Sequence, residues 1–163
     1  MTIEPADFEN PELLALLRIH LDGMYASSPQ DSVNALDLTG LSSPDVSLFV
    51  LKQNDHIIAM GALKALDATS GELKSMRTHP DHLRKGAAAA LLAHLIGEAR
   101  RRRYHRLSLE TGSGEAFEPA LALYRRYGFR NGAVFGDYTA TAFNQFLHLA
   151  LTGAPEDDPA VET

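Results

Sequence analysis

A short segment of the chain combines basic side chains with exposed backbone donors, a combination that binds anions. Residues 84–89 read Arg-Lys-Gly-Ala-Ala-Ala, at the point where a helix is expected to begin. The first N–H groups of a helix have no partner within it, and the helix dipole adds partial positive charge there. A glycine followed by alanines leaves these groups open to a phosphate or pyrophosphate. The prediction is a phosphate-binding turn made of Arg84, Lys85, Gly86, Ala87, Ala88 and Ala89; the alternative is an alanine-rich helix start without a ligand.

Two carboxylates are candidates for a catalytic base. Glu72 opens an expected strand, Glu72–Thr78, and Glu110 lies near the end of the next one, His105–Thr111. Because a helix separates these strands, they are most simply parallel neighbours joined by a right-handed crossover. Either carboxylate can face the gap where the two strands part and accept a proton there, directly or through water. The alternatives are a solvated or salt-bridged carboxylate, or one that binds a cationic substrate.

Other catalytic chemistries have little support in the sequence. The chain has no cysteine, which excludes a thiol nucleophile and a thiolate metal site. His79 and His82 are three positions apart, but no HExxH motif or acidic cluster accompanies them, so no metal site is predicted. Ser108, Thr111 and Ser113 lack the sequence of a nucleophile elbow and are expected to shape a pocket. The segment Gly136-Asp137-Tyr138 is either a loop that closes over that pocket or a plain turn.

Length and charge limit the domain organisation and the partners. A chain of 163 residues, 45% of them hydrophobic, can bury one core, so residues 1–152 are expected to form one domain. The net charge is −6, but four acids lie in residues 153–163, a segment expected to be a disordered tail. A domain that carries only −2 is not expected to bind nucleic acid. No run approaches the roughly 20 apolar residues of a membrane span, and without an apolar secretory segment a cytoplasmic protein is expected.

The hydrophobic pattern predicts an α/β (α+β) domain. We expect a central, mixed, mostly antiparallel twisted sheet of about six or seven strands, flanked by about four helices. Apolar residues at helical spacing indicate a helix at 11–25, another after the phosphate-binding turn, and a third at 115–127. Residues 26–44 are expected to be a loop with one helical turn. The expected strands are an edge strand at 1–7 and strands at 46–53, 56–66, 72–78, 105–111, 129–133 and 143–151.

Two segments together resemble a known family. The turn places Gly86 and Ala88 at the last two positions of the acyl-CoA-binding motif of GNAT-type N-acetyltransferases, with Leu83 where that motif has Gln or Arg. Residues 120–129, ALALYRRYGF, resemble the family's later A-x-x-L-Y-x-x-x-G-F segment. The resemblance covers about residues 45–151 and is closest to small bacterial acetyltransferases that have a GELKSM-like strand, LETGS and a GDY segment.

The resemblance implies a donor, a site and a reaction. Acetyl-CoA would be the acyl donor, without a metal, and its pyrophosphate would lie on the turn. Backbone groups of Met76, Arg77 and Thr78 would hydrogen-bond the pantetheine arm. Tyr124 would protonate the departing thiolate, since a phenol with a normal pKa near 10 is protonated at neutral pH; the alternative for Tyr124 is packing between helix and sheet.

The implied activity is transfer of an acetyl group to a primary amine of a small molecule or peptide in a ternary complex. A non-catalytic CoA-binding or regulatory module with the same fold is the alternative. A nucleotide-phosphate binder is disfavoured because the turn lacks the G-x-x-x-x-G-K-[ST] motif. A homodimer through the last strand or a sheet edge is a further possibility.

Overall fold

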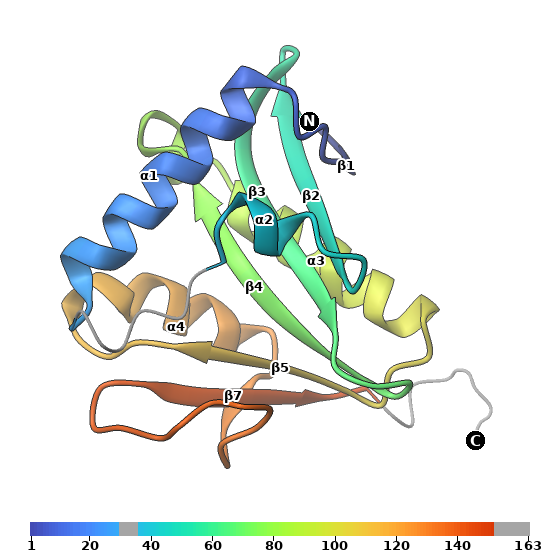
Figure 1. Cartoon of the computed structure of the whole chain (residues 1–163), viewed down its shortest axis with the longest axis vertical. Coiled ribbons are helices and arrows are strands. Elements are labelled where there is room, and N and C mark those ends of the chain that lie inside the picture. The colour runs from blue at the N-terminus through green and yellow to red at the C-terminus, as the bar shows by residue number, and fades with distance from the viewer. Residues whose placement is uncertain (30–35, 152–163) are drawn as a thin grey trace.

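A single seven-stranded sheet carries the domain (Figure 1). In this computed structural model, residues 1–29 and 36–151 are described. The strand order is β1-β2-β3-β4-β5-β7-β6. The pair β4 and β5 is parallel and every other neighbouring pair is antiparallel, which confirms the predicted mixed, mostly antiparallel sheet. The predicted tail at 153–163 and part of the predicted loop at 26–44 lie outside the described residues.

The strands follow the alternating segments of the sequence. Their bounds are β1 Thr2–Pro5, β2 Val46–Gln53, β3 His56–Ala65, β4 Ser70–Thr78, β5 Arg106–Thr111, β6 Arg130–Asn131 and β7 Gln145–Ala150. β1 lies at one edge of the sheet, as Pro5 predicted, because proline donates no ladder hydrogen bond. β6 is shorter than the predicted strand at 129–133 and pairs only with β7.

Helices cover both faces of the sheet. Their bounds are α1 Pro11–Ser27, α2 Leu38–Leu41, α3 Ala87–Arg101 and α4 Glu118–Arg126, with single 3₁₀ turns at 80–82 and 115–117. The apolar side of α1 packs on β2 and β3 in one cluster, which includes Leu13, Leu16 and Leu17. The apolar sides of α3 and α4 contribute to a second, larger cluster with β4 and β5. α1 crosses the sheet on the face opposite α3 (Figure 1).

The central strands β4 and β5 separate halfway along β4. Their pairing runs from Ser70 opposite Arg106 to Leu73 opposite Leu109. Beyond that point β4 bulges, since the register with β3 shifts between Met60 and Ala62 and Ser75 has a φ of 58°. Gly61 makes room for this bulge, because a β carbon at Gly61 would lie 2.5 Å from the sulfur of Met76. The bulge turns the second half of β4 away from β5 and opens a gap between them.

Candidate active site

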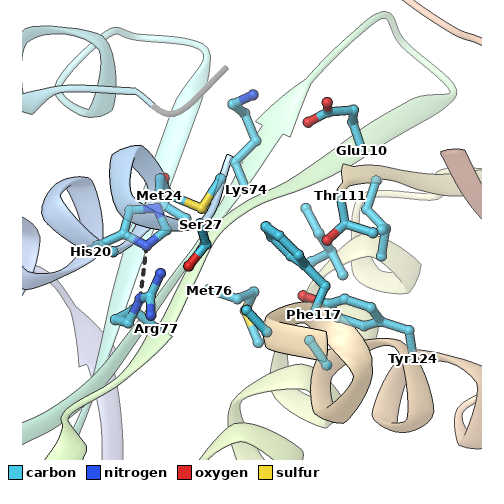
Figure 2. A pocket seen from close by; sticks show the side chains of 16 residues that line it. His20, Met24, Ser27, Lys74, Met76, Arg77, Glu110, Thr111, Phe117 and Tyr124 are labelled. Atoms are coloured by element: carbon cyan, nitrogen blue, oxygen red, sulfur yellow. Dashed lines mark hydrogen bonds between the residues drawn. The ribbon is translucent and has the colours of Figure 1, made fainter. Parts of the chain in front are cut away.

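A cavity of about 250 Å³ occupies the gap between β4 and β5 (Figure 2). β4 and the end of β5 form its floor, α1 forms one wall, and α4 with the turn before it forms the other. The lining residues are His20, Gly23, Met24, Ser27, Leu73, Lys74, Ser75, Met76, Arg77, Leu109, Glu110, Thr111, Ala116, Phe117, Ala120 and Tyr124.

The predicted phosphate-binding turn lies between the end of β4 and the start of α3. Arg84 and Gly86 both have a positive φ, 64° and 80°, which bends the chain so that α3 begins at Ala87. No side chain caps the first turn of α3. Apart from Gly86 and its two chain neighbours, no atom of the described residues lies within 4 Å of the position that a β carbon on Gly86 would occupy. The helix donors are therefore open to a ligand, and Arg84 and Lys85 lie next to them in the chain.

Tyr124 places its phenol on the wall of the cavity. Its side chain is 7% exposed and its ring packs against Phe129 at 5.8 Å between ring centres. Its hydroxyl forms no hydrogen bond with any residue that the structure describes. Burial raises the pKa of Tyr124 to about 12, against a smaller opposing effect of the positive charge on Arg77. The hydroxyl is therefore protonated at neutral pH and available to a group in the cavity.

The two candidate carboxylates lie in different surroundings. Glu72 pairs with Ser108 in the closed part of the β4–β5 ladder and is 2% exposed. One carboxylate oxygen of Glu72 accepts hydrogen bonds from Lys74 Nζ at 3.3 Å and from the hydroxyl of Tyr138. Glu110 follows Leu109, the last residue of β5 that pairs with β4, and lines the cavity. Only Glu110 lies where a substrate in the cavity can meet its carboxylate.

The segment Gly136–Tyr138 carries a side chain to the buried carboxylate of Glu72. Tyr138 packs on Phe135 and Phe146, at 5.3 and 5.9 Å between ring centres, and its hydroxyl contacts Glu72. Burial raises the pKa of Tyr138, and the negative charges of Glu72 and Glu110 raise it further. Tyr138 therefore acts as a hydrogen-bond donor to Glu72 and holds the loop before β7 against β4.

The residues of the cavity that were not selected from the sequence for their side chains include His20, Lys74, Ser75 and Arg77. Arg77 Nε donates a hydrogen bond of 3.1 Å to His20 Nδ1. His20 is 5% exposed, and burial with the nearby charges of Arg77 and Lys74 lowers its pKa to about 4. The hydroxyl of Ser75 is buried and has no partner among the described residues. The sequence signal for His20 is a histidine on the apolar side of a predicted helix, a position that more often holds a packed core residue.

The other predicted site residues lie either at the cavity or outside it. The cavity is lined by Met76, Arg77, Glu110 and Thr111, together with Tyr124. Thr78 lies outside the cavity, at the end of β4 next to the turn. Ser108 is instead fully buried and bonds His148 Nδ1 at 2.7 Å, and Ser113 Oγ accepts a hydrogen bond from Gln145. The described part of the chain contains no group of three or more histidines, cysteines or carboxylates placed to hold a metal ion.

The sequence matches one protein family over most of its length. Residues 13–129 match the family described as "Acetyltransferase (GNAT) family". The chain belongs to this family. It is 41% identical over 150 residues to the "Uncharacterized N-acetyltransferase YedL" of Escherichia coli (strain K12), covering 92% of this chain and 94% of that protein. It is 44% identical over 151 residues to the "Uncharacterized N-acetyltransferase YsnE" of Bacillus subtilis (strain 168), covering 93% of this chain and all of that one.

Solved structures show the same fold. A putative acyl-CoA N-acyltransferase from Klebsiella pneumoniae has a TM-score of 0.76 and 28% identity, and the match covers 92% of this chain and 97% of that one. A GNAT acetyltransferase from Elizabethkingia anophelis, solved with acetyl-CoA bound, has a TM-score of 0.65 and 21% identity, with 92% and 97% covered. The resemblance seen in the sequence is thus confirmed, and this GNAT protein is an enzyme of the N-acetyltransferase class. No helix within 1–29 or 36–151 is long and apolar enough to span a bilayer.

Proposed function

We propose that this GNAT enzyme transfers an acetyl group from acetyl-CoA directly to a primary amine of a small molecule or a peptide. The observation that carries the proposal is the placement of Tyr124 and Glu110 on one cavity, at the point where β4 and β5 separate. A protonated hydroxyl and a carboxylate on one cavity support the proposal, because acyl transfer between a thioester and an amine needs a proton donor and a proton acceptor.

The donor would lie along the second half of β4. β5 no longer pairs with β4 at Met76, Arg77 and Thr78, and backbone groups of these residues would hydrogen-bond the pantetheine arm like an added strand. The open donors at the start of α3, with Arg84 and Lys85, would hold the pyrophosphate. Bound there, acetyl-CoA supplies an activated acyl group as a thioester. One N–H at the bulge of β4 would polarise the thioester carbonyl.

Each catalytic residue has one proton to move. As the amine nitrogen bonds to the carbonyl carbon, Glu110 accepts a proton from that nitrogen, directly or through water. As the bond between that carbon and the sulfur breaks, Tyr124 donates its proton to the sulfur. The products are the acetylated amine and CoA with a free thiol, and a proton passes from Glu110 back to Tyr124 through solvent to restore the enzyme.

The size of the cavity favours a small acceptor. At about 250 Å³ it lies below the roughly 300–1,000 Å³ of sites that enclose drug-sized ligands. The tip of the pantetheine arm must share this volume with the acceptor. The cavity therefore fits a small amine, or the first residue of a peptide, better than a large rigid substrate.

The test is to measure binding and turnover in one protein preparation. Calorimetric titration with acetyl-CoA, CoA and ATP measures the donor site, and a thiol-release assay across a panel of amines, with product masses, measures the reaction. We expect acetyl-CoA to bind with micromolar affinity, ATP not to bind, and at least one amine to gain 42 Da. Binding of CoA without turnover of any amine would instead support the CoA-binding module, and binding of ATP alone would support a nucleotide site.

A further inference from the structure

Arg77 projects a cation into the cavity from the α1 side of β4 (Figure 2). Its side chain is half-buried, and burial lowers the pKa of its guanidinium, although an arginine stays charged at any pH at which proteins fold. No carboxylate in the part of the chain that the structure describes forms an ion pair with it. A partly desolvated cation without an anion is unfavourable, so its position calls for an anionic ligand.

His20 holds this guanidinium in one orientation. The pKa of His20 is lowered to about 4, so at neutral pH its ring is uncharged and Nδ1 accepts the hydrogen bond from Arg77 Nε. This contact uses the side of the guanidinium nearest its stem and leaves the two terminal nitrogens for another partner. Because His20 is neutral, it orients Arg77 without neutralising it.

Because Gly23 has no side chain, the guanidinium of Arg77 can lie against α1. A β carbon on Gly23 would lie 3.2 Å from Nη2 and 3.3 Å from Nη1 of Arg77, closer than an ordinary contact. Glycine inside a helix costs about 0.8–1 kcal/mol relative to alanine. Gly23 lies inside the 17-residue helix α1. The helix is therefore less stable than it would be with alanine at this position, which is where the arginine lies against it.

We propose that Arg77 binds a carboxylate of the acceptor, so that the acceptor is an amine with a carboxylate close to the reacting nitrogen, the chemistry of an α-amino acid. This inference rests on the proposed function and names its substrate class. The planar guanidinium matches a carboxylate through two parallel hydrogen bonds. Glu110 lies on the other side of the cavity from Arg77 (Figure 2), where it would meet the ammonium end of the same molecule. The two charges are arranged for a zwitterion.

The other cation of the cavity has a different role. Lys74 donates hydrogen bonds to Glu72 and to Tyr138, which ties its charge to the buried carboxylate. The donor's phosphates, in turn, have Arg84 and Lys85 next to the turn that would hold them. Arg77 therefore differs from these cations, because its guanidinium lies on the α1 side of β4 and is held there by a neutral partner.

The test compares matched acceptors. For each of several side chains, kcat/KM is measured by thiol release for the α-amino acid, for its amide, and for the amine that lacks the carboxyl group. We expect at least one amino acid to exceed its amide and its plain amine by 10-fold or more. Equal or higher values for the amides and amines throughout would overturn the inference and leave the proposed N-acetyltransferase function standing. No thiol release with any member would overturn both.

Variants then assign the preference to Arg77. In Arg77→Gln the acid-to-amide ratio should fall to about one, with the KM for acetyl-CoA changed less than 3-fold, and Arg77→Lys should restore part of the ratio. Gly23→Ala, which displaces the guanidinium but keeps the charge, should lower the ratio as well. Arg18→Gln, an exposed arginine on α1, is the matched control and should leave the ratio unchanged. A raised KM for acetyl-CoA in Arg77→Gln with an intact ratio would move Arg77 to the donor site and contradict the inference.

Discussion

The hydroxyl of Tyr138 donates a hydrogen bond to the carboxylate of Glu72, a residue 66 positions earlier in the chain. Lys74 bonds the same carboxylate oxygen. These contacts compensate a buried negative charge and attach the loop before β7 to the centre of the sheet. The sequence offered Glu72 and Glu110 as equal candidates for the catalytic base. These contacts distinguish them, because the Glu72 carboxylate is bonded within the fold and Glu110 lines the cavity.

The two glutamates should therefore respond differently to the same substitution. Glu72→Gln removes the charge that Lys74 and Tyr138 bond, and we expect it to lower the free energy of unfolding by about 2–4 kcal/mol. Glu110→Gln should lower the unfolding free energy by no more than about 1 kcal/mol but reduce kcat/KM by about 100-fold or more, and remove the acidic limb of its pH profile. Urea unfolding and pH–rate profiles of both variants check this. A Glu72→Gln variant with full stability and no activity would reverse the assignment.

Tyr124→Phe removes one hydroxyl from the cavity wall and tests the general acid. Turnover with acetyl-CoA should fall by about 100-fold, because the thiolate would leave without a proton donor. The Kd for acetyl-CoA, measured by calorimetry, should change by less than 3-fold. Tyr104→Phe is the matched control, since Tyr104 is also 7% exposed but packs in the core against Gly71. Equal turnover in wild type and Tyr124→Phe would remove Tyr124 from the mechanism.

Substitutions at two glycines of the α3 region distinguish an effect on phosphate binding from an effect on helix stability. Gly86→Ala places a β carbon at a φ of 80°, which costs about 1–2 kcal/mol of unfolding free energy, and crowds the ligand side of the turn. We expect the Kd for acetyl-CoA to rise at least 10-fold. Gly97→Ala lies inside the same helix, where the new β carbon would have only an ordinary contact with Arg101 Nη1 at 3.8 Å. It should raise stability by about 0.5–1 kcal/mol and leave the Kd unchanged. Unaltered acetyl-CoA binding in Gly86→Ala would place the pyrophosphate elsewhere.

His20 should make stability depend on pH. Its pKa is about 4 in the folded protein, below the ordinary value of 6.5, so the unfolded chain binds a proton first as the pH falls. The free energy of unfolding should therefore keep its full value above pH 6.5 and fall by on the order of 3 kcal/mol between pH 6.5 and about 4. Urea unfolding from pH 7.5 to 4.5 should show a smaller loss for His20→Gln than for wild type. His105→Gln, at an exposed histidine, should follow wild type; identical curves for His20→Gln and wild type would contradict this origin.

Much of the fold could be predicted because it rests on local patterns. Alternating apolar residues located the strands, and Asn10 with Pro11 located the start of α1, where the Asn10 side chain caps Glu12 N–H at 2.9 Å. The segment at 115–127 was expected as one helix, but it is a 3₁₀ turn followed by α4. Pro119 explains the boundary, because proline is tolerated in the first turn of a helix and not inside one.

The chemistry of single segments was also determined by the sequence. Gly86 and the alanines after it specify an open helix start, and the L-Y-x-x-x-G-F segment specifies a tyrosine on the helix beside the sheet. Both are short-range features, since the backbone conformation and the side-chain direction follow from a few neighbouring residues. Family membership follows from the same segments and their order along the chain.

The tertiary structure decided which residues share the cavity. Glu110 rather than Glu72 lies at the cavity because β4 and β5 part after Leu73. Beyond that point β4 bulges, and the bulge places Met76 against Gly61 on the neighbouring strand. The contact of Arg77 with His20 joins residues 57 positions apart. No local pattern encodes such pairs, because they form only when packing of α1 and β4 brings distant side chains together and removes water from between them.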